Sequence, residues 1–102
     1  MAVAWVYFVG CRDGSLYCGW STDPLARAAV HNAGKGGAYT RSRRPVTLIY
    51  YEACADRQAA LRREYALKRL TRRQKLVLVR QFIPPVISPV IPPALIPTTL
   101  PV

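Results

Sequence analysis

The sequence predicts an α/β fold in which a small, three-stranded, mostly antiparallel sheet is flanked by helices in the order β-β-α-β-α-α. Two observations predict this order. Runs rich in aromatic and β-branched residues, which are typical of strands, lie at residues 4–10, 15–20 and 46–54. Segments with helix-start residues begin near residues 22, 56 and 71. A chain of 102 residues has room for one such core and not for two.

The first two strands are predicted to form a hairpin around the Asp-Gly pair at residues 13–14. The length of the turn decides which side chains share a face of the sheet. A two-residue turn puts Tyr7 and Tyr17 on opposite faces, whereas a three-residue loop over residues 12–14 pairs Tyr7 with Gly19 and puts both tyrosines on one face. We favour the three-residue loop, with its glycine in the left-handed conformation.

A proline at the first helical position predicts a helix that begins at Pro24, with Thr22 or Asp23 as its N-cap. This helix is expected to end at residues 32–34. Its small and apolar side chains are expected to face the core at three positions: Leu25, Ala28 and Ala29.

The stretch GKGGAYTRSRRP at residues 34–45 holds many glycines and basic residues, and we predict a basic loop there rather than regular structure. A third strand follows over residues 46–54. Asp56 is expected to cap a second helix that runs to about residue 70, and Thr71 starts a third.

The domain is expected to span residues 1–82, because the segment that follows has a different composition. Residues 83–102 carry no charge and hold seven of the nine prolines. This density of proline is incompatible with a membrane-spanning helix and favours extended chain. We therefore expect a tail that is disordered or draped on the surface, with a specific interaction arm as the alternative. The N-terminus is not expected to be a signal peptide, since it lacks a basic segment and a cleavage site.

The charge of the chain points to a polyanionic partner. Fifteen Lys and Arg residues against five Asp and Glu give a net charge of +10, and nine of the fifteen lie between Arg57 and Arg80. Nucleic acid or an anionic membrane surface fits this balance, and we expect nucleic acid and no membrane. Three cysteines without a paired spacing predict neither a disulfide framework nor a zinc site, and they favour a cytoplasmic location.

Glu64 is the only acidic residue between Arg57 and the C-terminus. A carboxylate among apolar side chains is costly unless it is paired or bound to a metal. Lys68, one helical turn later, offers an ordinary ion pair, so a structural role and a metal-binding role both remain open. On a helical wheel the neighbours of Glu64 form the expected buried stripe: Ala60, Leu61, Tyr65 and Leu67.

Other patterns narrow the chemistry. Arg27 and His31, four residues apart, share one flank of the first helix, where they suit either a solvated face or a site. His31 is the only histidine, which excludes mechanisms that need two imidazoles. No serine lies in a nucleophile elbow, so an acyl hydrolase is not expected. The Gly-Lys pair at residues 34–35 is not a P-loop, because Ala29 and Gly36 stand where Gly and Ser or Thr are required.

The runs WVYFVGCRDGSLYCGW and ALRREYALKRL, with the helix between them, resemble the GIY-YIG nuclease superfamily over residues 4–80. The resemblance is to its small stand-alone bacterial members. Residues 5–7 take the place of the first signature tripeptide and residues 17–19 that of the second. Trp5 stands where the family has its first glycine, Cys18 replaces isoleucine, and no asparagine follows residue 32.

The resemblance implies a GIY-YIG-like fold and a set of site residues. Gly19 supplies the small residue of the second tripeptide, and Glu64 matches the metal-binding glutamate. The implied activity is that of a metal-dependent endonuclease that hydrolyses DNA at one divalent ion, Mg²⁺ or Mn²⁺. The implied catalytic residues are Tyr7, Tyr17, Arg27, His31 and Glu64.

Within this set, Tyr7 is the candidate base, with Tyr17 and His31 orienting water and phosphate, although the two tyrosines could exchange roles. Arg27 is expected to neutralise charge on the phosphate. A tyrosine with the usual pKa near 10 is a weak base at neutral pH, so the pKa of Tyr7 must be lowered by the metal or by Arg27 if it activates water.

Basic residues are expected to hold the nucleic-acid backbone. No pattern recognises base edges, so we expect weak sequence specificity, with branched or single-stranded DNA among the candidate substrates. The alternative is a non-catalytic module that binds DNA or RNA and keeps the same fold. The predicted binding residues are Lys35, Tyr39, Arg41, Arg43, Arg44, Lys68, Arg69, Arg72 and Arg73.

Overall fold

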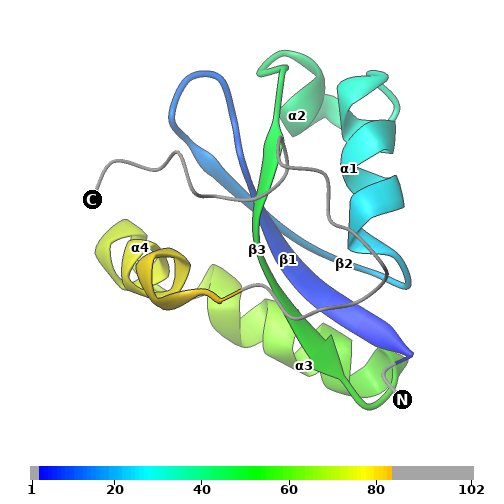
Figure 1. Cartoon of the computed structure of the whole chain (residues 1–102), viewed down its shortest axis with the longest axis vertical. Coiled ribbons are helices and arrows are strands. Elements are labelled where there is room, and N and C mark those ends of the chain that lie inside the picture. The colour runs from blue at the N-terminus through cyan, green and yellow to red at the C-terminus, as the bar shows by residue number, and fades with distance from the viewer. Residues whose placement is uncertain (1–2, 84–102) are drawn as a thin grey trace.

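Three strands form the centre of the domain in the computed structural model, which describes residues 3–83. They make one antiparallel sheet in the order β2-β1-β3. Figure 1 shows helices on both sides of this sheet, with α1 and α2 on one side and α3 and α4 on the other. The elements are β1 (Ala4–Gly10), β2 (Leu16–Ser21), α1 (Pro24–Asn32), α2 (Ala38–Arg41), β3 (Thr47–Cys54), α3 (Arg57–Lys68) and α4 (Arg72–Gln81).

The predicted fold class is confirmed, with the single helix α2 added to the predicted order. The predicted tail lies outside the described residues from position 84 onward. No helix within residues 3–83 is both long enough and apolar enough to span a bilayer.

The hairpin between β1 and β2 closes with the predicted three-residue loop. The Cys11 amide donates to the Ser15 carbonyl at 2.8 Å, and Gly14 has a φ of 86°, in the left-handed region. This loop sets the register that pairs Tyr7 with Gly19. Tyr7 and Tyr17 therefore share one face of the sheet, as predicted.

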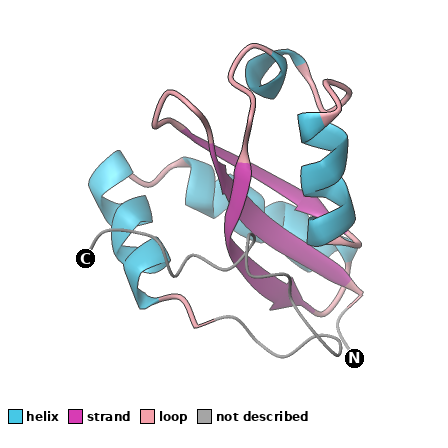
Figure 2. Cartoon of the chain, turned by 45° about the horizontal axis from the view of Figure 1, so that its top comes forward, coloured by secondary structure: helices cyan, strands magenta, loops and turns pink. Residues whose placement is uncertain are grey.

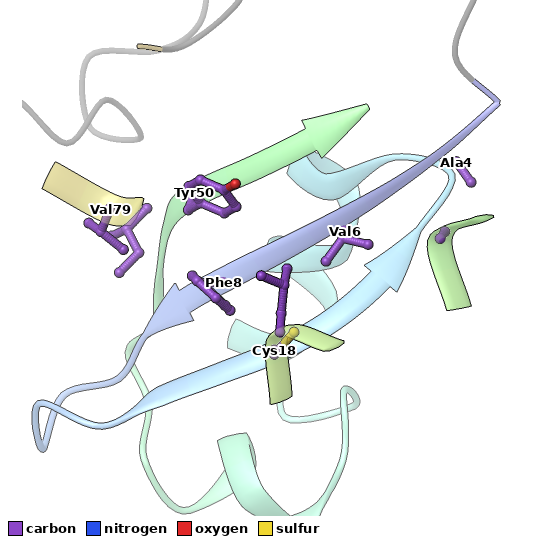
Figure 3. Close-up of a cluster of buried hydrophobic side chains, with 9 residues drawn as sticks. Ala4, Val6, Phe8, Cys18, Tyr50 and Val79 are labelled. Atoms are coloured by element: carbon purple, nitrogen blue, oxygen red, sulfur yellow. The ribbon is translucent and has the colours of Figure 1, made fainter. Parts of the chain in front are cut away.

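Side chains alternate along β1 and divide the core into two layers. Even-numbered residues such as Val6 and Phe8 pack with α3 and α4 in the layer drawn in Figure 3. Odd-numbered residues such as Tyr7 and Val9 pack with α1 in the other layer. Figure 2 shows the sheet lying between these two helical layers. The candidate site includes Tyr7 and Tyr17, which belong to the layer on the α1 side.

The three long helices begin at capping residues that the sequence predicts. Of the two candidates before Pro24, Asp23 is the N-cap of α1 and accepts from the Ala26 amide at 3.1 Å. Asp56 caps α3 in the same way, and Thr71 caps α4 through a capping box. These caps fix where α1 and α3 start, and so where their functional side chains project.

Two sequence predictions on the α1 side are wrong. Ala29 is exposed rather than core-facing, because the buried face of α1 runs through Pro24, Ala28 and His31. The stretch at 34–45 is not wholly irregular, since it contains the short helix α2. This helix forms because its Thr40 is buried against α1, a tertiary contact that local propensity does not register.

The buried stripe predicted for α3 is also partly wrong. Ala60 and Leu67 are fully buried, but Leu61 and Tyr65 are 40% and 64% exposed. The core face of α3 is narrower than predicted, because the helix rests on the sheet along one line of small and apolar residues. Glu64 consequently lies at the border of the buried face rather than within it.

Candidate active site

The Tyr7 side chain crosses the neighbouring strand at Gly19. Tyr7 is 1% exposed, and a Cβ atom at Gly19 would lie 2.6 Å from its hydroxyl oxygen and 2.7 Å from its Cζ. Only glycine leaves room for the phenol at this position. Because β2 is an edge strand, the phenol reaches toward the open edge of the sheet.

His31 holds the Tyr7 hydroxyl from α1. Its Nε2 lies 2.9 Å from the Tyr7 oxygen, and its Nδ1 lies 2.8 Å from Oγ1 of Thr40 on α2. His31 is fully buried, and the Tyr17 ring packs edge-on against it with ring centroids 5.2 Å apart. Tyr7, His31 and Thr40, from β1, α1 and α2, thus form one buried polar cluster, and the half-buried Tyr17 of β2 packs against it.

Charged groups on both sides of the sheet act on this cluster. Burial raises the pKa of Tyr7 to about 12, a rise that Arg27 opposes and the charge of Glu64 reinforces. Burial and the Arg27 guanidinium together lower the pKa of His31 below its usual value of 6.5. At neutral pH, Tyr7 is therefore protonated and His31 is a neutral imidazole.

Four of the five candidate residues, Tyr7, Tyr17, Arg27 and His31, lie on the α1 side of the sheet, and Glu64 is linked to them only through the effect of its charge on Tyr7. Arg27 comes from α1 and Glu64 from α3, which pack on opposite faces of the sheet. A tyrosine that activates water by ionising needs a lowered pKa. Burial instead raises the pKa of Tyr7.

Glu64 is the least committed of the five carboxylates in the chain. Its side chain is 18% exposed, and its ion pair is with Lys68, whose Nζ lies 3.7 Å away on the next helical turn. The other four have structural roles: Asp13 pairs with Arg43, Asp23 and Asp56 cap helices, and Glu52 binds Arg63 at two points.

The donor set at Glu64 fits one kind of metal binding. Within residues 3–83, no group of three or more His, Cys, Asp or Glu side chains is placed to hold an ion. A cage made by the protein alone is therefore not formed there. A single partly exposed carboxylate fits Mg²⁺, which keeps several waters and takes further oxygens from a substrate phosphate.

A hollow lies beside Arg27, one of the five candidate residues. A pocket of about 490 Å³ lies between the end of β2 and α1. It is lined by Trp20, Ser21, Thr22, Asp23, Ala26, Arg27 and Val30.

A family model described as the GIY-YIG catalytic domain matches residues 3–76 of the chain, which is more than half of its length. The chain belongs to the GIY-YIG family. GIY-YIG nuclease domains act on nucleic acid, so this chain carries a domain of endonuclease type.

Named relatives of this GIY-YIG chain are small UPF0213 proteins. That of Staphylococcus haemolyticus is 49% identical over 81 residues, which cover 79% of this chain and 99% of the relative. That of Staphylococcus epidermidis is 50% identical over 76 residues, which cover 74% and 93%. The solution NMR structure of the UPF0213 protein BH0048 from Bacillus halodurans is 43% identical, covers 76% of this chain and 82% of that one, and gives a TM-score of 0.49.

The predicted nucleic-acid-binding residues of this GIY-YIG domain fall into two groups. One group lies near the Tyr17 side of the site: Lys35, Tyr39, Arg41, Arg43 and Arg44, on the segment from the end of α1 to β3. The other group lies at the end of α3 and the start of α4, across the sheet: Lys68, Arg69, Arg72 and Arg73. The sequence alone does not show that these residues form two groups, whereas the structure places the groups on different sides of the sheet.

Several of these side chains are already engaged within the protein. The Arg43 guanidinium lies over the Tyr39 ring at 3.9 Å, and its Nε donates to Asp13 at 3.1 Å. Lys68 pairs with Glu64, and Arg69 donates to the Tyr65 hydroxyl at 2.9 Å. Arg41 and Arg44 donate to backbone carbonyls but stay exposed, as do Lys35, Arg72 and Arg73.

Sequence reasoning missed two residues that hold His31 in this GIY-YIG domain. Thr40 meets its Nδ1, and Gly36 packs so closely that a Cβ atom there would overlap the imidazole ring. Three glycines within four residues are the only signal for this close approach. Nothing in the sequence distinguishes Thr40.

Proposed function

We propose that this chain is a metal-dependent endonuclease that hydrolyses phosphodiester bonds of DNA with weak sequence specificity. The observation that carries the proposal is the Tyr7 hydroxyl, hydrogen-bonded to a neutral buried histidine and subject to the charges of both Arg27 and Glu64. The GIY-YIG family and the net charge of +10 support nucleic acid as the substrate.

Glu64 would hold the divalent ion, Mg²⁺ or Mn²⁺. When bound there, the ion would supply Lewis-acid stabilisation of charge on the leaving oxygen. The ion pair with Lys68 does not prevent this role. Lys68 is 51% exposed, and an exposed pair spaced by four residues on a helix stabilises by only about 0.3–0.5 kcal/mol.

Tyr7 and His31 provide a path for the proton of the attacking water. With a hydrogen on Nδ1, His31 donates to Thr40 and its Nε2 accepts from the Tyr7 hydroxyl. The water then gives its proton to the Tyr7 oxygen while Tyr7 passes its own proton to His31. This relay needs no tyrosinate, and the raised pKa of Tyr7 is therefore compatible with catalysis.

The same geometry supports proposed roles for Tyr17 and Arg27. The Tyr7 hydroxyl, and not that of Tyr17, is hydrogen-bonded to His31, which favours Tyr7 as the base. Tyr17 packs on the imidazole and would orient the phosphate or the water. Arg27, which lines the adjacent pocket, would neutralise the charge that develops on the phosphate.

A non-catalytic module that binds DNA or RNA is the second candidate. Two observations favour this binding module. Glu64 is already paired with Lys68, and the raised pKa of Tyr7 keeps its hydroxyl protonated at neutral pH. A plasmid-nicking assay with Mg²⁺ or Mn²⁺ separates the two functions. It compares the wild type with Glu64→Gln and with Glu52→Gln, which removes a carboxylate that serves structure.

If the protein is a nuclease, nicking should require the metal. Its rate should fall at least about 100-fold in Glu64→Gln and persist in folded Glu52→Gln. Intact plasmid with every variant, together with a clear gel shift, would instead establish the binding module.

A further inference from the structure

A second pocket, which is basic, shares no lining residue with the candidate active site. Its volume is about 440 Å³, and it lies where the β1–β2 loop meets the segment between α1 and β3. None of its lining residues is acidic. They are Arg12, Asn32, Arg41, Ser42, Arg44 and Pro45.

Backbone carbonyls hold two of the guanidinium groups in place. Arg44 donates through Nε to the Arg41 carbonyl at 2.9 Å and through Nη1 to the Asn32 carbonyl at 3.4 Å. Arg41 donates through Nε to the Gly34 carbonyl at 3.3 Å. Each guanidinium has five N–H donors, so most donors remain free to bind a ligand.

The turn after α1 is shaped to admit Arg44. Gly34 has a φ of 82°, and a Cβ atom there would lie 2.9 Å from Nη1 of Arg44. A side chain at this position would be strained and would also displace the guanidinium. The pocket is therefore built by the fold rather than by chance overlap of surface side chains.

The positive charge of the pocket is not neutralised by a nearby acid. Asp13, the neighbour of Arg12 in the sequence, already accepts from Nε of Arg43 at 3.1 Å and from the Ser15 hydroxyl at 2.6 Å. Three arginines that line one pocket without a carboxylate are stabilised by an anion. Guanidinium groups match phosphate oxygens in a two-point geometry.

A chain of contacts links the pocket to the candidate active site. The Tyr17 and Tyr39 rings lie 5.8 Å apart, and the Arg43 guanidinium covers Tyr39. The Arg43 carbonyl accepts from the Arg12 amide at 3.0 Å. Figure 1 shows α2, which carries Tyr39, beside the end of α1. A strand that leaves the site over Tyr39 therefore reaches the pocket.

We propose that this pocket binds an internal phosphodiester of the nucleic-acid strand that the candidate active site engages, at a position other than the scissile bond. The proposal rests on the proposed function. Arg12, Arg41, Ser42 and Arg44 are all exposed, so a continuous strand can pass through the pocket with a nucleotide on either side.

The test measures binding of a short DNA duplex and its single strand, without divalent metal, over a range of salt concentrations. The pocket variant is R12Q/R41Q, which removes two guanidinium groups that contribute little to the fold. The matched control is R62Q/R80Q, which removes the same charge from exposed residues whose side chains make no hydrogen bond or ion pair within residues 3–83. Arg44→Gln is a second pocket variant, and thermal melting checks that each variant folds.

We expect R12Q/R41Q to lose about tenfold in affinity and to lower the slope of log affinity against log salt by about 1. We expect R62Q/R80Q to stay within about twofold of the wild type, because neither residue lines the pocket or is a predicted binding residue, and exposed charges across the sheet from the pocket are screened. Equal losses in both double variants would overturn the proposal.

Oligonucleotides with and without a terminal phosphate separate the two sources of phosphate. Equal losses by R12Q/R41Q on both support an internal diester, whereas a loss confined to phosphorylated ends would overturn it. If the wild type cuts DNA and R12Q/R41Q binds and cuts it equally well, the subsite is overturned and the nuclease is not. A wild type that binds through the pocket but never cuts supports the subsite and contradicts the nuclease.

Discussion

Gly19 and Gly36 each leave the space that a side chain of the candidate site occupies. Gly19 allows the Tyr7 phenol to cross β2, and Gly36 allows the backbone to pack on the His31 ring. The hydrogen bond between Tyr7 and His31 depends on both close approaches, one for each of its side chains. Tyr7 and His31 are therefore positioned by residues that carry no functional group of their own.

Gly19→Ala is expected to lower DNA cleavage by about 100-fold while the domain stays folded. The new methyl group would lie 2.6 Å from the Tyr7 oxygen and displace it, and a misplacement of about 1 Å can cost that much in rate. Gly10→Ala is the control, because its methyl group would meet Ile49 at an ordinary 3.4 Å. Equal activity in the two variants would separate the Tyr7 position from catalysis.

The pH dependence of cleavage distinguishes a proton relay from a tyrosinate. Because the pKa of His31 lies below 6.5, the relay predicts a constant kcat/KM between about pH 7 and 9 and a decrease as acid protonates His31. A base that had to ionise with a pKa of about 12 would give a rate that rises about tenfold per pH unit over the same range. A steady rise of that kind would contradict the relay.

At the level of the elements, the site depends on where the helices start. Asp56 caps α3 and so fixes the position of Glu64 two turns further along. Asp56→Ala is expected to lower the free energy of unfolding by about 1 kcal/mol, because an N-cap acceptor is lost. Asp56→Asn keeps an acceptor and should retain most of that stability in thermal melts. If both variants melted alike, the cap would not be the cause.

The elements also show what could be predicted from the sequence. The Asp-Gly pair predicts the hairpin, and the choice of a three-residue loop predicts the pairing of Tyr7 with Gly19, because register follows from loop length. The helix α2 could not be predicted, since it is stabilised by burial of Thr40 against His31, nine residues away. The exposure of Leu61 and Tyr65 depends on how α3 rests on the sheet, which no local pattern records.

For the whole molecule, the charge distribution predicts salt-dependent binding. The basic residues lie near the candidate site on the α2 side and on α3 and α4 across the sheet. If six phosphates are neutralised on duplex DNA, log affinity should fall against log salt with a slope of about −5. Fluorescence anisotropy over a salt series measures this slope. A slope near zero would remove nucleic acid as the partner.

The most direct measurement is a double-mutant cycle on metal-dependent cleavage with Tyr7→Phe and Glu64→Gln, under single-turnover conditions. Tyr65→Phe, which removes an exposed hydroxyl from α3, is the control for the first change. Residues of one catalytic unit are strongly non-additive, so each single variant should lose at least about 100-fold and the double variant little more. A shared catalytic centre would be contradicted if either single variant cleaved DNA at the wild-type rate, or if the wild type did not cleave at all.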